Sequence, residues 1–299
     1  MSAPLRVAVI GLGVISRFYL AALRDAPGSR LVAVCDSDPA RAAGHGVPAY
    51  TDHRRLLAAE RPDAVVVTVP NDAHFAVCAD ALDGGAAVCV EKPLALTAER
   101  GAALRVLAER RGRALFTAFH RRYNDAVGRL RAACGDAPVA ELTVRYLEDI
   151  REHAGADSWY LDARRCGGGC VADNGPNAFD LVRLLAGPAR VGAARIERDA
   201  SGTDVRADVA LRAGAARARV LLDWAYPGER KDVEVRLADG RTLHADMLAG
   251  HDGFKASLWH EYAAIVRAFE ERVAGGAADD GGGLAALRCV EDAYRLEAA

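Results

Sequence analysis

The sequence predicts an α/β protein of two domains: a doubly wound parallel sheet over residues 1–120, then an α+β domain with a large open antiparallel sheet over residues 121–299. Two observations carry this prediction. In the first part, continuously apolar runs alternate with helix-compatible segments, which is typical of βαβ units whose strands are covered on both faces. In the second part, apolar and polar residues alternate along each run, which is typical of strands with one open face.

Turn and capping signals divide the chain into these elements. One helix is expected to begin after Thr97, a good N-cap, and to stop at Gly112. The five apolar runs of the first domain are 5–10, 31–36, 64–70, 86–93 and 113–120. In the second domain, runs such as ELTVRYLEDI and KDVEVRLADG predict strands, and we expect helices over 176–186, 256–274 and 284–297 and a flexible loop over 275–283.

The composition excludes several classes of protein. Hydrophobic residues make up 51% and charged residues 27%, with a formal net charge of −2, so we expect a soluble globular protein that does not bind nucleic acid. The N-terminal apolar run is too short for a secretion signal, and no run is long enough to cross a membrane, which predicts a cytoplasmic protein. The seven cysteines contain no C-x-x-C pair and no zinc set, so they are interpreted as small apolar residues, and no metal site is predicted.

A glycine motif follows the first apolar run and opens a helix. In it, Gly11 allows the tight turn, Gly13 lets the backbone approach a pyrophosphate, and Ser16 is small enough to replace the usual third glycine. The N–H groups of Gly13, Val14 and Ile15, at the helix start, suit an anion. The sequence therefore predicts a Rossmann domain that binds a dinucleotide.

The end of the second run favours one form of that cofactor. Asp36 stands where a carboxylate accepts hydrogen bonds from the adenine ribose hydroxyls. Ser37 follows it, and the next arginine is Arg41, so a 2′-phosphate would face Asp36 without an adjacent cation. The sequence thus favours NAD over NADP.

Polar residues also follow the next two runs, where ligands lie in open α/β sheets. Thr68, Pro70 and Asn71 end the third run, and His74 either orients the cofactor loop or makes only local hydrogen bonds. Glu91 and Lys92 end the fourth run before Pro93, which restricts that exit. Partial burial at this edge would lower the pKa of Lys92 toward a range useful for acid/base chemistry.

The motifs together resemble the Gfo/Idh/MocA family of sugar and cyclitol oxidoreductases. The matching segments are GLGVIS, TVPNDAH, EKP, FHRRYN and GGGCVADNGPNAFD, in the family's order and across most of the chain. The resemblance implies three polar catalytic positions, at Lys92, Asp173 and Asn177, the last of which is typically His. It also implies an open sheet that carries substrate and oligomer contacts.

Asn177 changes the chemistry that this segment can support. An amide donates and accepts hydrogen bonds but exchanges no proton near neutral pH. Lys92 is then the best candidate acid/base, with Asp173 orienting it or the substrate, or else capping the helix that follows. His120 and Tyr123 are weaker candidates for a proton carrier. Tyr160 could bind substrate with Trp159, or the pair could simply pack.

Three functions stay open at this stage. The first is hydride transfer between nicotinamide and a carbinol or ketone carbon of a sugar, nucleotide sugar, cyclitol or aminocyclitol. The second is a non-catalytic sensor that binds NAD and a sugar, and the third is a redox cycle with tightly held NAD. A homodimer or homotetramer is expected, on the argument that an exposed apolar sheet face seeks a partner.

Overall fold

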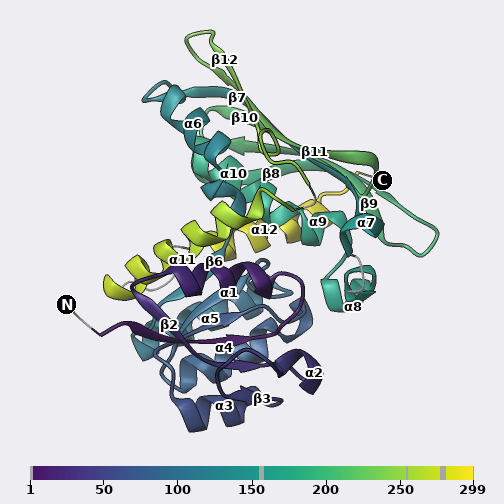
Figure 1. Cartoon of the computed structure of the whole chain (residues 1–299). Coiled ribbons are helices and arrows are strands. Elements are labelled where there is room, and N and C mark those ends of the chain that lie inside the picture. The colour runs from purple at the N-terminus through teal and green to yellow at the C-terminus, as the bar shows by residue number, and fades with distance from the viewer. Residues whose placement is uncertain (1–2, 155–157, 254, 277–280, 299) are drawn as a thin grey trace. The chain divides into compact units, whose positions relative to one another are not determined.

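The computed structural model describes residues 3–154, 158–253, 255–276 and 281–298, and within them the chain forms two compact units (Figure 1). Unit one comprises Met1–Ala118 and Tyr262–Leu284, and unit two comprises Phe119–Glu261 and Ala285–Ala299. The chain first passes between the units next to the predicted boundary at residue 120. Residues 262–284, expected in the second domain, belong to unit one. Part of the predicted loop, 277–280, lies outside the described residues.

Unit one is the predicted doubly wound α/β domain, which is confirmed. Its sheet has the order β3-β2-β1-β4-β5-β6, and every neighbouring pair is parallel. The strand order reverses between β1 and β4, so the carboxyl ends of these two strands flank the switch point. The strands are β1 (Leu5–Ile10), β2 (Ser29–Cys35), β3 (Ala49–Tyr50), β4 (Ala64–Val67), β5 (Ala87–Glu91) and β6 (Leu115–Ala118).

Helices connect these strands, as the alternating pattern predicts. Thr97 caps α5 by accepting from the Arg100 N–H, and Gly112 ends that helix in the left-handed conformation, so both capping predictions are confirmed. The helices and the short 3-10 turn of this part are α1 (Ser16–Asp25), α2 (Pro39–Ala42), α3 (His53–Glu60), η1 (Asn71–Ala73), α4 (His74–Asp83) and α5 (Ala98–Arg111).

A late segment of the chain completes the core of unit one. Helix α11 (Leu258–Ala274) brings Tyr262 onto α1, where its ring stacks on Phe18 with centroids 5.4 Å apart. Further along α11, Phe269 packs against Phe116 of β6 at 5.9 Å. Aromatic contacts of this kind bury large apolar areas, so this segment contributes to the stability of unit one.

Unit two contains the predicted open sheet, with one difference from the expectation. The strand order is β12-β11-β7-β10-β9-β8, and all pairs are antiparallel except β7 with β10, which run parallel. Hairpin-like spacing cannot reveal such a pairing, because β7 and β10 are far apart in sequence. The strands are β7 (Val139–Asp149), β8 (Ala189–Arg198), β9 (Asp204–Ala213), β10 (Ala216–Asp223), β11 (Ala225–Leu237) and β12 (Thr242–Asp246).

One face of this sheet is covered and the other carries charge. Helix α10 (Gly175–Ala186) packs on β7 and β10, and α6 (Asp125–Cys134) packs on β12 (Figure 1). On the open face, Arg219 pairs with Asp208 across neighbouring strands. The remaining short elements are η2 (His120–Tyr123), α7 (Ile150–Ala154), η3 (Ser158–Leu161), α8 (Ala163–Cys166) and α9 (Cys170–Asp173), and α12 (Gly282–Arg295) ends the chain's helices.

The cysteines and the helices bear on two predictions from composition. All seven cysteines are buried free thiols, in agreement with their interpretation as small apolar residues. Burial raises the pKa of the Cys35 thiol to about 11, which makes it a poor nucleophile. In the part of the chain that the structure describes, no helix combines the length and the apolar character needed to cross a membrane.

Candidate functional site

The glycine turn after β1 is built by close backbone packing. Gly11 has a φ of 95°, and a Cβ placed on it would lie 2.6 Å from the carbonyl carbon of Thr68 and the nitrogen of Val69. The Thr68 hydroxyl donates to the Gly11 carbonyl at 2.6 Å. Only glycine satisfies both the conformation and the space, so the loop is held against the end of β4.

The start of α1 is suited to an anion. Ile15 occupies the N-cap position and makes no capping hydrogen bond with its side chain. The buried Ser16 donates its hydroxyl to the Gly13 carbonyl at 2.7 Å, so it fills the place of the third glycine without a clash. The loop from Gly13 through Val14 to Ile15 therefore presents a helix N-terminus at the switch point, where a pyrophosphate is stabilised by N–H groups and the helix dipole.

Asp36 lies over the same loop. Its Oδ2 accepts from the Leu12 N–H at 2.7 Å and its Oδ1 from the Asp38 N–H at 2.9 Å. These bonds fix the carboxylate and leave lone pairs for a ribose diol. Ser37 is exposed, and the guanidinium of Arg41 lies 3.8 Å from Asp38. The nearest following cation is therefore engaged with another carboxylate.

His74 joins two loops at the carboxyl edge of unit one. The ring is fully buried, with Nδ1 2.7 Å from the Pro93 carbonyl oxygen and Nε2 2.9 Å from that of Val69. Burial lowers the pKa of His74 to about 4, so the ring is neutral at physiological pH. Asn71, also buried, begins the 3-10 turn after Pro70. His74 therefore bonds to the loops after both β4 and β5. The alternative that it makes only local hydrogen bonds does not account for the bond to Pro93.

Glu91 and Lys92 have different surroundings although they are adjacent. The Glu91 side chain is buried in unit one and accepts from the Tyr19 hydroxyl at 2.9 Å. Burial raises the pKa of Glu91 to about 6, although the charge of Lys92 opposes this shift. Lys92 is half-buried at the strand end, and its peptide bond to Pro93 is cis. A cofactor contact from Glu91 would thus come from its backbone, whereas Lys92 presents its side chain.

Packing explains the glycine triplet before α10. A Cβ on Gly168 would lie 2.2 Å from the Tyr294 hydroxyl, and one on Gly169 would lie 2.0 Å from the Asp204 carbonyl oxygen. The Asp204 carboxylate then accepts from the N–H groups of Gly169 and Val171 at 2.6 and 2.8 Å. Gly168 also has a φ of 147°, so both conformation and close contact require glycine there, whereas close contact alone requires it at Gly169. These contacts fix the start of α9.

Asp173 and its neighbours form the junction between α9 and α10. Asp173 is the last residue of α9 and is buried, while Asn174 holds the N-cap position of α10. The alternative that Asp173 caps α10 is therefore wrong. The side chain of Asn174 makes no capping hydrogen bond either. Its Nδ2 donates to Glu148 at 2.9 Å, and Glu148 pairs with the buried Lys231 at 2.6 Å.

Asn177 lies in the first turn of α10 and contacts a histidine. Its Nδ2 is 3.1 Å from Nε2 of His120, and its Oδ1 is buried with no hydrogen-bond partner among the described residues. Nδ1 of His120 is 2.5 Å from Oε2 of Glu261, whose Oε1 accepts from Arg121 at 2.9 Å and from Asn124 at 2.6 Å. His120 was a weaker candidate from its sequence position, and no sequence signal marked Glu261.

Charge balance explains this buried cluster. Burial alone would raise the pKa of Glu261, but the Arg121 guanidinium and His120 outweigh it and hold that pKa at about 2. Glu261 is fully buried and Arg121 is 3% exposed, so the pair is shielded from solvent. Nearby, Arg122 of η2 makes a two-point ion pair with Asp180 of α10, at 2.6 and 2.9 Å.

The aromatic pair before the glycine triplet is already stacked. The rings of Trp159 and Tyr160 lie 3.8 Å apart with an interplanar angle of 25°. The two rings therefore pack on each other. Substrate binding by Tyr160 stays a prediction. Lys92 lies in unit one, whereas Tyr160, Asp173 and Asn177 lie in unit two.

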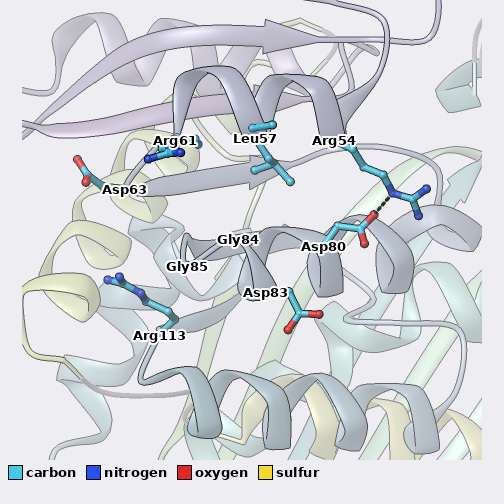
Figure 2. A pocket seen from close by; sticks show the side chains of 11 residues that line it. Arg54, Leu57, Arg61, Asp63, Asp80, Asp83, Gly84, Gly85 and Arg113 are labelled. Carbon is cyan, nitrogen blue, oxygen red and sulfur yellow. Dashed lines mark hydrogen bonds and ion pairs between the residues drawn. The ribbon is translucent and has the colours of Figure 1, made fainter.

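A separate hollow of about 690 Å³ opens at the opposite edge of the parallel sheet (Figure 2). It lies between the ends of α3 and α4 and the start of β4. Arg54 reaches Asp80 there at 2.8 Å, and Arg61 and Arg113 also line it. Because strands β1, β2, β4 and β5 end at the other edge, this hollow is distinct from the glycine loop and Asp36.

Comparison with known proteins identifies the class. Residues 5–119 match the family model described as an oxidoreductase family with an NAD-binding Rossmann fold, and residues 137–242 match the GFO/IDH/MocA C-terminal domain. The chain belongs to the Gfo/Idh/MocA oxidoreductase family, as its motifs predicted. Its first unit carries the NAD-binding domain of that family.

Three relatives illustrate the likeness. D-glucoside 3-dehydrogenase of Escherichia coli strain K12 is 30% identical, over 62% of this chain and 55% of its own. D-xylose 1-dehydrogenase (NADP(+)) 2 of Haloferax volcanii is 32% identical, over 70% and 66%. The crystal structure of a D-galactose-1-dehydrogenase protein from Rhizobium etli has a TM-score of 0.84 at 26% identity, covering 100% of this chain and 96% of that one. The chain thus spans about half to two thirds of the curated relatives' length.

Proposed function

We propose that this protein is an NAD-dependent oxidoreductase. It transfers a hydride between nicotinamide and a secondary alcohol or ketone carbon of a sugar, nucleotide sugar, cyclitol or aminocyclitol. The observation that carries the proposal is the loop at Gly11, packed on Thr68 and overlain by the fixed carboxylate of Asp36. Membership of the oxidoreductase family supports it, and the relatives named as sugar dehydrogenases support the substrate class.

The residues around the switch point fit this cofactor. Gly11 packs the loop against Thr68. Gly13 would let the backbone approach a pyrophosphate, with N–H groups from Val14 and Ile15, and Asp36 with Ser37 would receive the ribose. When bound, NAD supplies the acceptor, or NADH the donor, of the hydride. The groups proposed to line its nicotinamide half are Thr68, Pro70, Asn71, His74, Glu91 and Lys92.

Four side chains are proposed to act on the substrate. Lys92 acts as the acid/base group at the reacting oxygen, where its ammonium group stabilises developing negative charge. Asp173 orients Lys92 or the substrate, Asn177 holds a hydroxyl or carbonyl through its amide, and Tyr160 contacts the ring. Cytoplasmic location belongs to the same proposal.

We propose that this protein forms a homodimer or homotetramer. The expected reason was an exposed apolar face of the sheet in unit two, and the structure points to a different one. Among the described residues, the large exposed apolar side chains are Val106, Leu161 and Trp259, and none of them lies in the sheet of unit two. The open face of that sheet instead bears cross-strand ion pairs such as Arg219–Asp208. A dimer through this face would therefore use polar contacts.

The test is nicotinamide absorbance of the purified protein. NAD(H) and NADP(H) are supplied in both directions with a panel of sugars, keto-sugars, cyclitols and nucleotide sugars. We expect turnover with NAD that Lys92→Met lowers by about 10²–10⁴-fold, while Lys255→Met, a lysine substitution away from the strand end, leaves it unchanged. Equal activity in Lys92→Met and wild type would contradict the role of Lys92.

Asn177 favours one competing function, a sensor that binds NAD and a sugar without turnover, because an amide exchanges no proton. Calorimetry separates the two. Saturable NAD binding together with ligand-induced stabilisation by a panel sugar, but no change in absorbance with any substrate, would support the sensor and contradict the enzyme.

A further inference from the structure

The hollow at the edge where the parallel strands begin has the size of a ligand site. Its volume of about 690 Å³ falls within the range of pockets that hold small molecules. All of its lining residues belong to Met1–Ala118 of unit one, so a single compact unit forms its walls. The hollow lies away from the glycine loop, and the function proposed above assigns it no role.

Several charged side chains around this hollow already have partners. Arg54 donates to Asp80 at 2.8 Å, and Arg111 donates to Asp83 at 3.0 Å. These pairs neutralise two of the three aspartates in the lining. Neither of the two is therefore available to the remaining arginines of the hollow.

Those remaining arginines, Arg61 and Arg113, lie at one end of the hollow, above and below the turn of Gly84 and Gly85 (Figure 2). Nη2 of Arg113 lies 3.8 Å from the position of a Cβ placed on Gly85. Among the described residues, neither guanidinium has a hydrogen-bond or ion-pair partner. Because a guanidinium presents N–H donors in a planar fork that matches phosphate oxygens, the two side chains indicate an anion site.

The backbone of Arg61 supports a role for its side chain. Arg61 follows the last turn of α3 with φ 45° and ψ 60°, the left-handed conformation in which glycine is the usual residue. Among the described residues, Lys255 is the only other non-glycine residue with positive φ. Glycine would avoid the steric strain of this conformation, so a guanidinium that binds a ligand gives a reason for arginine here.

The rest of this end of the hollow favours hydroxyl groups on the ligand. Asp63 uses Oδ2 to accept from the Arg6 N–H at 2.9 Å, which leaves Oδ1 to accept from a ligand. The ends of α3 and α4 add partial negative charge from their last carbonyl groups. These acceptors would repel a bare anion, whereas hydroxyl groups would donate to them. Leu57 and Pro62 add apolar surface for the carbon atoms of a ring.

We propose that this hollow binds a small phosphorylated sugar, with the phosphate between Arg61 and Arg113 and the hydroxyl groups directed to Asp63 and the helix ends. Two guanidinium groups match the charge of a phosphate dianion, whereas a carboxylate carries one charge and needs only one. Binding here does not depend on the proposed oxidoreductase function.

Calorimetry on the full chain tests the proposal. The probes are glucose 1-phosphate, glucose 6-phosphate and ribose 5-phosphate, with inorganic phosphate and glucose as references, each with and without saturating NAD. We expect at least one sugar phosphate to bind about tenfold or more tighter than either reference, because it fills both parts of the hollow. NAD should not compete with it, since the glycine loop is a separate site.

Variants locate the binding site. Arg61→Gln combined with Arg113→Gln should weaken binding of the sugar phosphate by about 100-fold or more, since each charged hydrogen bond contributes about tenfold. Replacing both arginines with lysine keeps the charges without the fork, so the affinity should lie between these two. Arg24→Gln, at an exposed arginine of α1 outside the lining, should change nothing. All variants should bind NAD as the wild type does, which shows that unit one is folded.

Three results would overturn the proposal. If no sugar phosphate binds at millimolar concentration, the two arginines serve only to compensate the negative ends of α3 and α4. If the double glutamine variant binds as tightly as the wild type, the ligand lies elsewhere. If inorganic phosphate binds as tightly as the sugar phosphates, the hydroxyl groups make no contact. Each result is read from binding alone, so a failure of the oxidoreductase function would be seen separately as absence of turnover.

Discussion

The pKa values of two buried glutamates in this protein are shifted in opposite directions. Glu91, at the end of β5 in unit one, accepts a hydrogen bond from the neutral Tyr19, and burial raises its pKa to about 6. Glu261, in unit two, is as deeply buried but touches Arg121, which holds its pKa at about 2. Burial alone disfavours the ionised carboxylate and raises its pKa. A buried cation in direct contact favours the ionised form and can lower the pKa below its usual value. The glycine loop of unit one is held by close backbone packing. The buried cluster of unit two is held by the ion pair between Arg121 and Glu261.

The largest effect should come from breaking the charged pair. Glu261→Gln keeps the shape but leaves Arg121 buried with no compensating charge, so we expect a loss of about 3–5 kcal/mol in the free energy of unfolding. Urea unfolding at neutral pH measures it, with Glu91→Gln as the matched control. A cost below about 1 kcal/mol would mean that Arg121 does not depend on this carboxylate.

The pH dependence should follow the same pair. Since the pKa of Glu261 is lowered on folding from about 4.5 to about 2, the unfolded chain binds more protons between these values. The stability from this group is complete above pH 4.5 and is lost as pH falls toward 2. Unfolding curves in this window should be steeper in pH for wild type than for Glu261→Gln, and equal slopes would count against the ion pair.

Substitution at the glycine loop should have an intermediate effect. Gly11 and Gly44 both have positive φ, 95° and 86°, but an added Cβ meets Thr68 and Val69 only at Gly11. Gly44→Ala should cost about 1–2 kcal/mol from its conformation alone. Gly11→Ala should cost about 1–3 kcal/mol more from the clash and weaken NAD binding about tenfold or more, as calorimetry would record. Equal effects of the two substitutions would show that close packing is unimportant.

Sequence patterns predicted unit one better than unit two for a physical reason. The loop at Gly11 and the strands around it are local signals, whereas the bond between His120 and Glu261 joins residues 141 positions apart. The parallel pairing of β7 with β10 and the return of 262–284 to unit one are also non-local. The motifs located Asp173 and Asn177, but no spacing rule could bring a distant carboxylate to His120.

The smallest effect should be a gain in stability. Because folding raises the pKa of Glu91 from about 4.5 to about 6, the folded state binds its proton first, and stability falls as pH rises between these values. Glu91→Gln removes this penalty and should stabilise the protein by about 1–2 kcal/mol at pH 7.5, with no gain at pH 4. A loss at pH 7.5 would mean that the hydrogen bonds of Glu91 outweigh its burial.

The stacking of Tyr262 and Phe269 on Phe18 and Phe116 also constrains how the protein is made. A ribosome releases the chain from its N-terminus, so the parallel sheet emerges long before the aromatic residues of α11 that cover part of its core. Until then, Phe18 and Phe116 lack these partners. The nascent NAD-binding domain therefore stays incomplete while Phe119–Glu261 of unit two is synthesised. Chaperones that bind exposed aromatic surface would meet this chain during that interval.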